Sequence, residues 1–194
     1  MSHVSDFFSG AKQISAQIDT SKVEALAQEL ESLRRSAGRL FVLGVGGSAG
    51  NASHAVNDFR KLCGIEAYAP TDNVSEVTAR TNDEGWETVF VEWLKVSRIS
   101  KSDALFVLSV GGGDIDRNIS LNLVRAVDHA KSVGARVLGV VGKESGYTAK
   151  VGHVVVTIPV IRDELITPYS EAFQAVIWHC LVSHPALQVR PTKW

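Results

Sequence analysis

Two uninterrupted apolar runs constrain the fold of this chain more than any other feature. They read Ala-Leu-Phe-Val-Leu at residues 104–108 and Val-Leu-Gly-Val-Val at residues 137–141. Runs of strand length without polar alternation are typical of strands buried on both faces, as in a parallel sheet that helices cover on each side. The sequence therefore predicts an α/β fold, a three-layer αβα sandwich.

The rest of the chain alternates strand-like and helix-like segments. We expect five parallel strands, at residues 40–45, 66–69, 104–109, 137–141 and 153–158, and helices at 49–62, 86–96, 121–133 and 170–183, with a short one at 74–80. Two helices, at 4–18 and 21–37, precede the sheet, and Ser21 with Glu24 forms a capping box for the second. Residues 1–194 are predicted to form a single domain, in which the helices of residues 1–37 cover either the α/β core of residues 38–194 or a subunit interface.

The bulk composition narrows the range of partners. The formal net charge of −1 gives no reason to expect nucleic acid or an anionic membrane as a partner. No apolar run approaches the roughly 18 residues of a membrane span, and the first residues lack the basic and apolar parts of a secretory signal. We therefore expect a cytoplasmic protein in which Cys63 and Cys180 are reduced core residues.

Three polar loops follow predicted strands, so they gather at one edge of the sheet, where folds of this class bind ligands. They span residues 44–48, 70–75 and 109–120, and the first and third are rich in glycine and serine. The first loop opens a helix, whose N-terminal amides favour a phosphate or carboxylate. Ser120 is placed to cap the helix that follows the third loop. Together the loops predict an anion site for a small phosphorylated molecule.

Each loop also has a plainer interpretation. The pattern Gly44-x-Gly46-x-x-Ala49 fits relaxed dinucleotide binding, but the match is weak, and Asp72 lies later than the roughly 20-residue spacing of a ribose contact. The glycines can also serve only to let the chain turn and pack closely. Turn and cap chemistry alone explains the polar residues of the second loop and of the segment after it, namely Asp72, Asn73, Asn82 and Asp83.

Two pairs of helix residues form a candidate metal or acid–base set. His54 and Asp58 are four residues apart on one predicted helix, which places them on one face. Glu171 and His179 are eight apart on another, so they are offset by about 80° and converge only on a point beside the helix. Two imidazoles and two carboxylates suit zinc and would also accept iron or manganese. Spacing alone, however, favours individually satisfied helix residues.

The whole arrangement resembles the sugar isomerase (SIS) domain, and within it the phosphoheptose isomerases, which convert sedoheptulose 7-phosphate to a heptose 7-phosphate. The matching pieces cover most of the chain: Gly46-Gly-Ser-Ala-Gly-Asn-Ala-Ser-His54, Thr71-Asp-Asn with Asn82-Asp-Glu-Gly85, Val141-Gly-Lys-Glu-Ser-Gly146, and the pair Glu171 and His179. The resemblance implies subunits that assemble through the N-terminal helices and build their sites between them. We therefore expect a homo-oligomer, with a dimer of dimers, a tetramer, as the default.

The resemblance also implies roles for individual residues. In that family a histidine and a carboxylate four residues later, with a glutamine and a histidine eight apart, bind zinc or act as acid and base. These roles fall on His54, Asp58, Glu171 and His179, with Zn²⁺ or another divalent metal as cofactor, Asp58 or Glu171 as base and His179 as acid. Aspartate stands at position 58 where the family usually has glutamate, and glutamate at 171 where it has glutamine. The implied substrate-binding residues are Gly46, Gly47, Ser48, Asp72, Asn73, Asn82, Asp83, Ser109, Gly111, Gly112, Gly113 and Ser120.

The phosphate side departs further from the family pattern. Val45 replaces an asparagine of the first loop, and the third loop is longer and loses two hydroxyl donors. It gains Asp114 and Asp116, which would repel a dianion if they faced it. The backbone of residues 111–113 and the charge of Arg117 can compensate, so we expect Asp114 to turn away from the phosphate.

Two functions from different classes follow. The first is a metal-assisted aldose–ketose isomerase that acts on a sugar phosphate of heptose type. The second is a non-catalytic SIS module that senses a sugar phosphate or assembles with a regulatory partner. The altered third loop favours the second function, and the intact spacing of four potential ligands opposes it. A dinucleotide-binding protein is a third and less favoured hypothesis.

Overall fold

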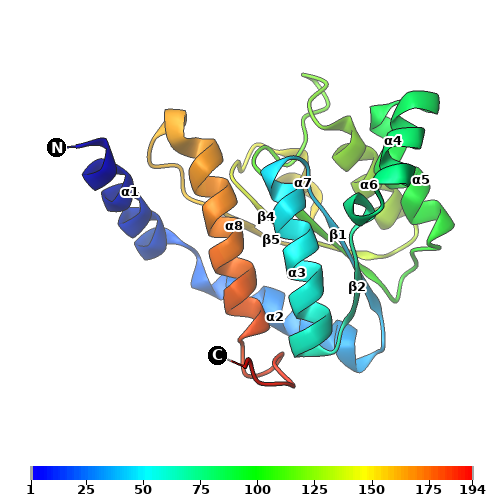
Figure 1. Ribbon diagram of the computed structural model, residues 1–194, viewed down its shortest axis with the longest axis horizontal. Helices are drawn as coiled ribbons and strands as arrows, with labels where there is room; N and C mark the ends of the chain where they lie inside the picture. The colour runs from blue at the N-terminus through cyan, green and yellow to red at the C-terminus, as the bar shows by residue number, and fades with distance from the viewer. Residues whose placement is uncertain (1, 194) are drawn as a thin grey trace.

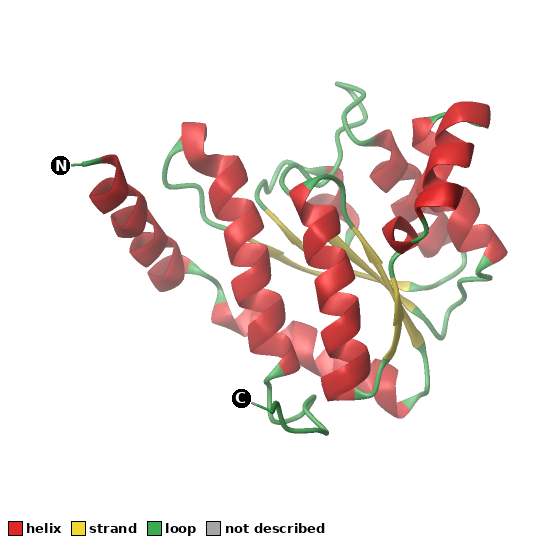
Figure 2. Ribbon diagram, in the orientation of Figure 1, coloured by secondary structure: helices red, strands yellow, loops and turns green. Residues whose placement is uncertain are grey.

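A five-stranded parallel sheet forms the centre of the protein (Figures 1 and 2). The computed structural model describes residues 2–193. The strands are β1 (Arg39–Leu43), β2 (Glu66–Tyr68), β3 (Ala104–Ser109), β4 (Arg136–Val141) and β5 (Val154–Thr157), in the order β2-β1-β3-β4-β5. Leu43 of β1 lies opposite Val107 of β3, so the loops after these two strands leave the sheet at the same edge. The predicted α/β fold with five parallel strands is confirmed.

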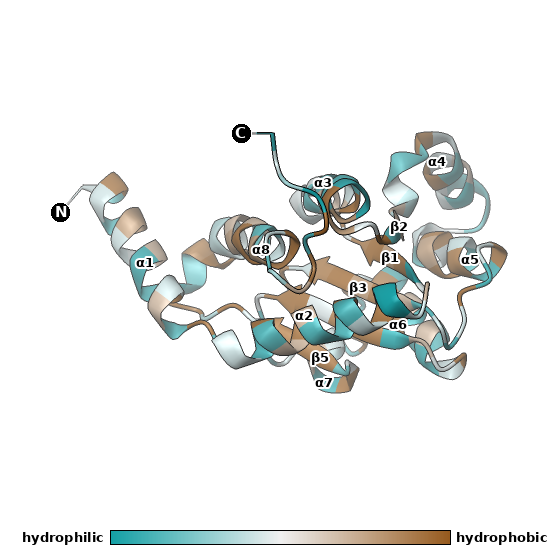
Figure 3. Ribbon diagram, turned by 90° about the horizontal axis from the view of Figure 1, so that it is seen from below, coloured by the Kyte–Doolittle hydropathy of each residue, from teal (hydrophilic) through white to brown (hydrophobic). Residues whose placement is uncertain are grey.

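Two helical layers cover the sheet, as Figure 3 shows. Helices α3 (Gly47–Cys63) and α8 (Ile166–Val182) pack on one face, and α5 (Val89–Val96), α6 (Leu121–Ser132) and the short α7 (Tyr147–Val151) on the other. Alternate residues of a strand point to opposite faces. Leu40 and Val42 of β1 accordingly belong to the core under α3 and α8, whereas Phe41 and Leu43 belong to the other core. Both faces of the sheet are buried, as the apolar runs predicted.

The two N-terminal helices differ in how they pack. Helix α2 (Thr20–Arg35) contacts β5, α8 and β1, and buries Leu26, Ala27, Leu30 and Leu33. Helix α1 (His3–Gln17) projects from the body of the molecule (Figure 1), although the Tyr169 hydroxyl of α8 donates to the carbonyl of Phe7 at 2.8 Å. It buries Ile14 completely, but leaves Val4 and Phe8 62% and 68% exposed.

Several local predictions need correction. Asp19, not Ser21, caps α2, because its carboxylate accepts bonds from the amides of Ser21 and Lys22. Helix α8 begins at Ile166, preceded by the 3₁₀ turn Asp163–Leu165, and therefore earlier than predicted. Cys63 is buried, but Cys180 is exposed, because it lines an open groove between α2 and α8. Within residues 2–193, none of the helices is both long and apolar enough to cross a membrane.

A buried carboxylate joins the start of β3 to β1. Asp103 is 2% exposed, and its Oδ1 accepts hydrogen bonds from the backbone N and the Nε of Arg39, at 3.0 and 3.1 Å. Its Oδ2 accepts from Nη2 of Arg39 and from the amide of Ser100, both at 2.8 Å. Burial acts to raise the pKa of Asp103, but the hydrogen bonds from Arg39 and Ser100 outweigh it and hold the pKa below its ordinary value of 3.8.

We expect Asp103→Ala to lower the free energy of unfolding by about 3 kcal/mol at neutral pH, since it leaves a half-buried guanidinium without its partner. A carboxylate with a depressed pKa stabilises the fold fully above its unfolded pKa and loses this effect as the pH falls through its folded pKa. The difference in the free energy of unfolding between wild type and Asp103→Ala should therefore shrink below about pH 4. Urea unfolding of both proteins over a pH series measures it, and a difference that stays constant into acid would contradict this account.

Candidate functional site

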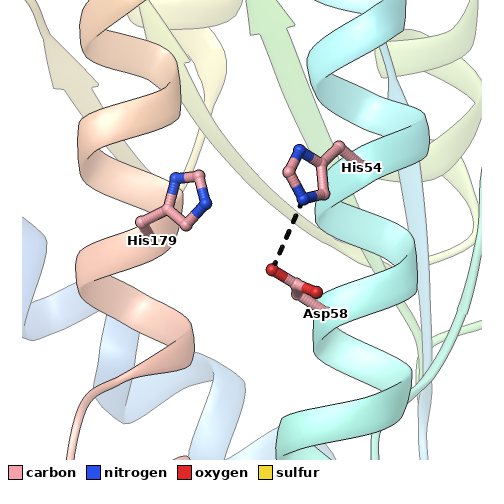
Figure 4. Close-up of side chains that lie close together, drawn as sticks. All are labelled: His54, Asp58 and His179. Atoms are coloured by element: carbon pink, nitrogen blue, oxygen red, sulfur yellow. Dashed lines mark ion pairs between the residues drawn. The ribbon is translucent and has the colours of Figure 1, made fainter. Parts of the chain in front are cut away.

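Three of the four predicted metal donors converge between two neighbouring helices. His54 and Asp58 project from α3 and His179 from α8, and Figure 4 shows the His179 ring directed across the gap toward the other two. One ligand atom from each residue lies within 4.8 Å of the others. Because α3 and α8 pack side by side, residues more than 100 positions apart in the sequence form one cluster.

The two members on α3 interact directly. Nε2 of His54 lies 3.7 Å from Oδ2 of Asp58, as the four-residue spacing predicted. The side-chain Nδ2 of Asn57 donates to Oδ1 of Asp58 at 2.8 Å, so one carboxylate oxygen is held in place and the other faces His54. The His54 side chain is 57% exposed and that of Asp58 only 16%. The carboxylate is thus ordered by its neighbours, while the imidazole is accessible from solvent.

The orientation of His179 leaves a defined nitrogen free. Its Nδ1 lies 2.8 Å from the carbonyl oxygen of Ala175, one turn earlier on α8. A carbonyl oxygen only accepts hydrogen bonds, so Nδ1 must carry the proton. Nε2 is then the nitrogen that offers a lone pair, and a backbone carbonyl on the other ring nitrogen is the arrangement usual for metal-binding histidines.

A buried indole lies beneath both imidazoles. Trp178 is fully buried, and its ring centroid lies 4.6 Å from that of His54 and 3.5 Å from that of His179. The two imidazole centroids are 5.4 Å apart and nearly perpendicular. The indole therefore prevents the His54 and His179 rings from moving inward toward the core.

Glu171, the fourth predicted donor, does not join this cluster. It lies more than two turns before His179 on α8, and its carboxyl group lies instead against Gly47, at the start of α3. A Cβ added at Gly47 would approach the carboxyl carbon of Glu171 to 2.5 Å, so a larger residue there would displace this carboxyl group. The structure thus brings together three of the four predicted donors, and Glu171 lies outside the cluster because eight residues along α8 place it about 12 Å from His179 in the direction of the helix axis.

The first predicted anion loop has the expected geometry. Gly46 adopts φ 62° and ψ −128°, which favours glycine, and Gly44 packs so tightly on Ser48 that a Cβ there would meet the Ser48 carbonyl at 2.2 Å. Ser48 is buried as the second residue of α3. The loop therefore presents the positive end of a 17-residue helix at the carboxyl edge of the sheet.

The third loop uses its polar groups partly on itself. The Ser109 hydroxyl accepts a hydrogen bond from the amide of Gly112 at 2.9 Å. Gly112 and Gly113 have positive φ values of 73° and 86°, and their carbonyls accept from the amides of Thr148 and Tyr147 on α7. The Ser109 hydroxyl is therefore used to hold the conformation of its own loop. The carbonyls of Gly112 and Gly113 join the loop to α7.

The inserted part of this loop is a small hairpin. Asp114 and Ile119 exchange backbone hydrogen bonds, and the Asp114 carboxylate accepts from the amide of Arg117 and lies 3.3 Å from its Nε. Arg117 thus neutralises Asp114 within the hairpin. Ser120 does not cap α6 as predicted, because its left-handed backbone, with φ 51°, is not the extended conformation of a capping residue.

The remaining predicted residues are not members of the donor cluster and make other contacts. Asp72, in the 3₁₀ turn Pro70–Asp72, accepts a bond from the Ser53 hydroxyl of α3, and Asn73 caps α4 (Val74–Asp83) by accepting from the amide of Glu76. Asn82 and Asp83 end α4, where they are exposed and bond to each other. They do not cap the next segment, the 3₁₀ turn Trp86–Thr88 that leads into α5. The structure thus gives Asn73 a structural role.

Sequence reasoning missed the residues that hold α3 against α8 beside the cluster. These are Asn51, Gln174 and Trp178, which are joined by hydrogen bonds across the two helices. Asn51 and Trp178 each lie within four positions of a predicted donor, but a polar or aromatic residue at such a place is ordinary in a helix. Only the packing of the two helices identifies them.

Comparison with known proteins agrees with this architecture. A family model described as the SIS domain matches residues 6–142. The chain is 30% identical over 195 residues to a lincomycin biosynthesis protein of Streptomyces lincolnensis, covering 95% of this chain and 69% of that protein. It is 27% identical over 179 residues to a probable phosphoheptose isomerase of Thermoplasma volcanium, covering 90% and 86%.

A solved structure has the same fold. The phosphoheptose isomerase of Neisseria gonorrhoeae aligns with a TM-score of 0.80 over 92% of this chain and 95% of that one, at 22% sequence identity. The family model covers well over half of the chain, and its match extends from α1 to the end of β4. The chain therefore belongs to the SIS domain family.

Proposed function

We propose that this protein is a metal-assisted aldose–ketose isomerase that acts on a sugar phosphate of heptose type, interconverting sedoheptulose 7-phosphate and a heptose 7-phosphate. The observation that carries the proposal is the convergence of His54, Asp58 and His179 between α3 and α8, about two turns along the helix that the anion loop opens. Relatives that bear the name phosphoheptose isomerase support it.

The donor set fits a divalent metal. Two imidazoles and one carboxylate match the ligands of a catalytic zinc site, in which three protein ligands leave one position open. Iron or manganese would also accept this set. Because Nδ1 of His179 is bonded to the Ala175 carbonyl, Nε2 is the nitrogen left for an ion. A bound ion would polarise the substrate carbonyl and stabilise the negative charge that develops on its oxygen.

The proposed reaction moves one proton between neighbouring carbons. A base removes the proton from the carbon next to the carbonyl, the carbonyl oxygen gains a proton, and an enediol forms. The proton then returns to the former carbonyl carbon while the neighbouring hydroxyl loses its own. Asp58 and Glu171 are the candidate bases, and Glu171 lies outside the cluster, so a bound ion would not occupy its carboxylate.

His179 is the proposed acid partner, and its proton exchange takes place at Nε2, because Nδ1 is bonded to Ala175. The same nitrogen is the one available to a metal ion. One nitrogen cannot hold an ion and donate a proton at once, so the metal content of a His179 variant separates the two roles.

The function is tested by incubating the metal-loaded protein with sedoheptulose 7-phosphate in D₂O. We expect a heptose 7-phosphate that carries deuterium at the carbon next to its carbonyl, because the base exchanges its proton with solvent. A chelator should abolish turnover, and Zn²⁺, Mn²⁺ or Fe²⁺ should restore it. Binding of the sugar phosphate without turnover under all these conditions would reject the isomerase.

The phosphate is proposed to lie at the start of α3, with Ser48 and the backbone of residues 111–113 around it. Ser48→Ala should weaken binding of the sugar phosphate by roughly 1–3 kcal/mol, because a hydrogen bond to a charged group is lost. Isothermal titration measures this, with Ser132→Ala, an exposed serine at the end of α6, as the control. Unchanged affinity in Ser48→Ala would place the phosphate elsewhere.

A non-catalytic sugar-phosphate sensor is the second candidate. It is favoured by the third loop, where the Ser109 hydroxyl is engaged with Gly112 and a hairpin with acidic residues is inserted. In that case the D₂O experiment gives no deuterated product while titration still shows binding. A shift of the melting temperature by NAD or NADP, and by no sugar phosphate, would instead favour the dinucleotide hypothesis.

A further inference from the structure

The side-chain amide of Asn51, on α3, contacts three residues on successive turns of α8. Nδ2 of Asn51 donates to the carbonyl oxygen of Glu171 at 2.9 Å and to Oε1 of Gln174 at 3.2 Å. Its Oδ1 faces the indole nitrogen of Trp178 at 3.5 Å. Asn51 therefore contacts α8 along the same stretch that leads to His179.

These contacts are shielded from water. Gln174 and Trp178 are completely buried, and Nε2 of Gln174 has no partner among the described residues, so Gln174 depends on Asn51 for its side-chain hydrogen bond. A buried side-chain amide that loses its hydrogen-bond partner costs free energy. Arrangements of the two helices that break the Asn51–Gln174 bond are therefore disfavoured. The hydrogen bonds of Asn51 consequently favour one position of α8 relative to α3, both along the helix axis and in rotation about it.

That position is the one at which the candidate metal donors meet. Asn51 lies one turn before His54 on α3, and Trp178 directly precedes His179 on α8. The Trp178 ring contacts both imidazoles, so a shift of the indole moves the surface on which both rings rest. The Trp178 side chain thus contacts Asn51 as well as both histidines.

We propose that Asn51 is a positioning residue of the His54–Asp58–His179 site: its carboxamide sets the register between α3 and α8, and through Trp178 the separation of the two imidazoles. This inference rests on the metal site of the proposed function. It predicts that loss of the amide weakens metal binding although Asn51 is not itself a ligand. Partners of metal ligands commonly change affinity by about 10- to 100-fold.

The test compares Asn51→Ala with the wild-type full chain by Zn²⁺ affinity, in competition with a chromophoric chelator, and by the visible spectrum of bound Co²⁺. We expect about 10- to 100-fold weaker Zn²⁺ binding and an altered Co²⁺ spectrum. If Asn51→Ala fails to fold, Gln174→Met, which removes one partner of the amide and keeps the side-chain volume, should weaken Zn²⁺ binding in the same direction.

Cys63→Ala is the matched control, since the buried Cys63 thiol donates to the carbonyl of Val182 across the other end of the same helix pair. We expect it to lower the melting temperature and leave Zn²⁺ affinity unchanged. Equal losses of affinity in Cys63→Ala and Asn51→Ala would show a merely structural role and overturn the inference, as would wild-type affinity in Asn51→Ala. A wild-type chain that binds no Zn²⁺ or Co²⁺ would overturn the metal site and the inference together.

Discussion

His179→Gln is expected to lower isomerase turnover by about a thousandfold, within the range that a positioned acid or base contributes. The glutamine retains a polar side chain of similar size but offers no imidazole Nε2 toward His54 and Asp58. Turnover of sedoheptulose 7-phosphate and the metal content of the purified protein should be measured together. Loss of both assigns His179 to the metal, whereas loss of turnover with full metal content assigns it to proton transfer.

His129→Gln provides the control for this variant, because His129 lies on α6, on the opposite side of the sheet from the cluster. It should leave both turnover and metal content near wild-type values. If His179→Gln retained full activity, neither role proposed for His179 could stand.

The second large effect concerns assembly. We propose that the active unit is a tetramer in which α1 packs against another subunit, because α1 extends from the body with Val4 and Phe8 exposed. A second exposed apolar surface is the groove between the start of α2 and α8, which is lined by Ile18, Val23, Phe173, Val176, Ile177, Cys180 and Leu181. Exposed apolar surface of this kind normally marks an interface.

The double variant Val4→Glu, Phe8→Glu should therefore dissociate the assembly and abolish turnover while the single chain remains folded. Light scattering should give about four times the 20.9 kDa chain mass for the wild type and a lower mass for the variant. Val96→Glu, at an equally exposed apolar residue on α5, is the control and should not change the mass. A wild-type mass of one chain at micromolar concentration would refute the tetramer.

Local patterns predicted the fold well because they report local geometry. The apolar run at 104–108 lies in β3, whose bounds of 104–109 are those predicted, and α6 begins at Leu121 as expected. Loop chemistry was less well predicted. Ser120 follows a strand and precedes a helix, as a capping residue would, but the inserted hairpin turns its backbone into the left-handed region. A cap depends on backbone angles that the residue type alone does not determine.

For the candidate site, the sequence by itself determined the pair His54 and Asp58, because four residues along one helix always return to the same face. It could not determine the third donor, since Glu171 and His179 belong to a helix whose rotation against α3 depends on packing. The tertiary structure decided that His179 joins the cluster and that Glu171 lies against Gly47. The reason is physical: side chains from distant segments meet only where buried contacts, here those of Asn51, Gln174 and Trp178, fix one helix against the other.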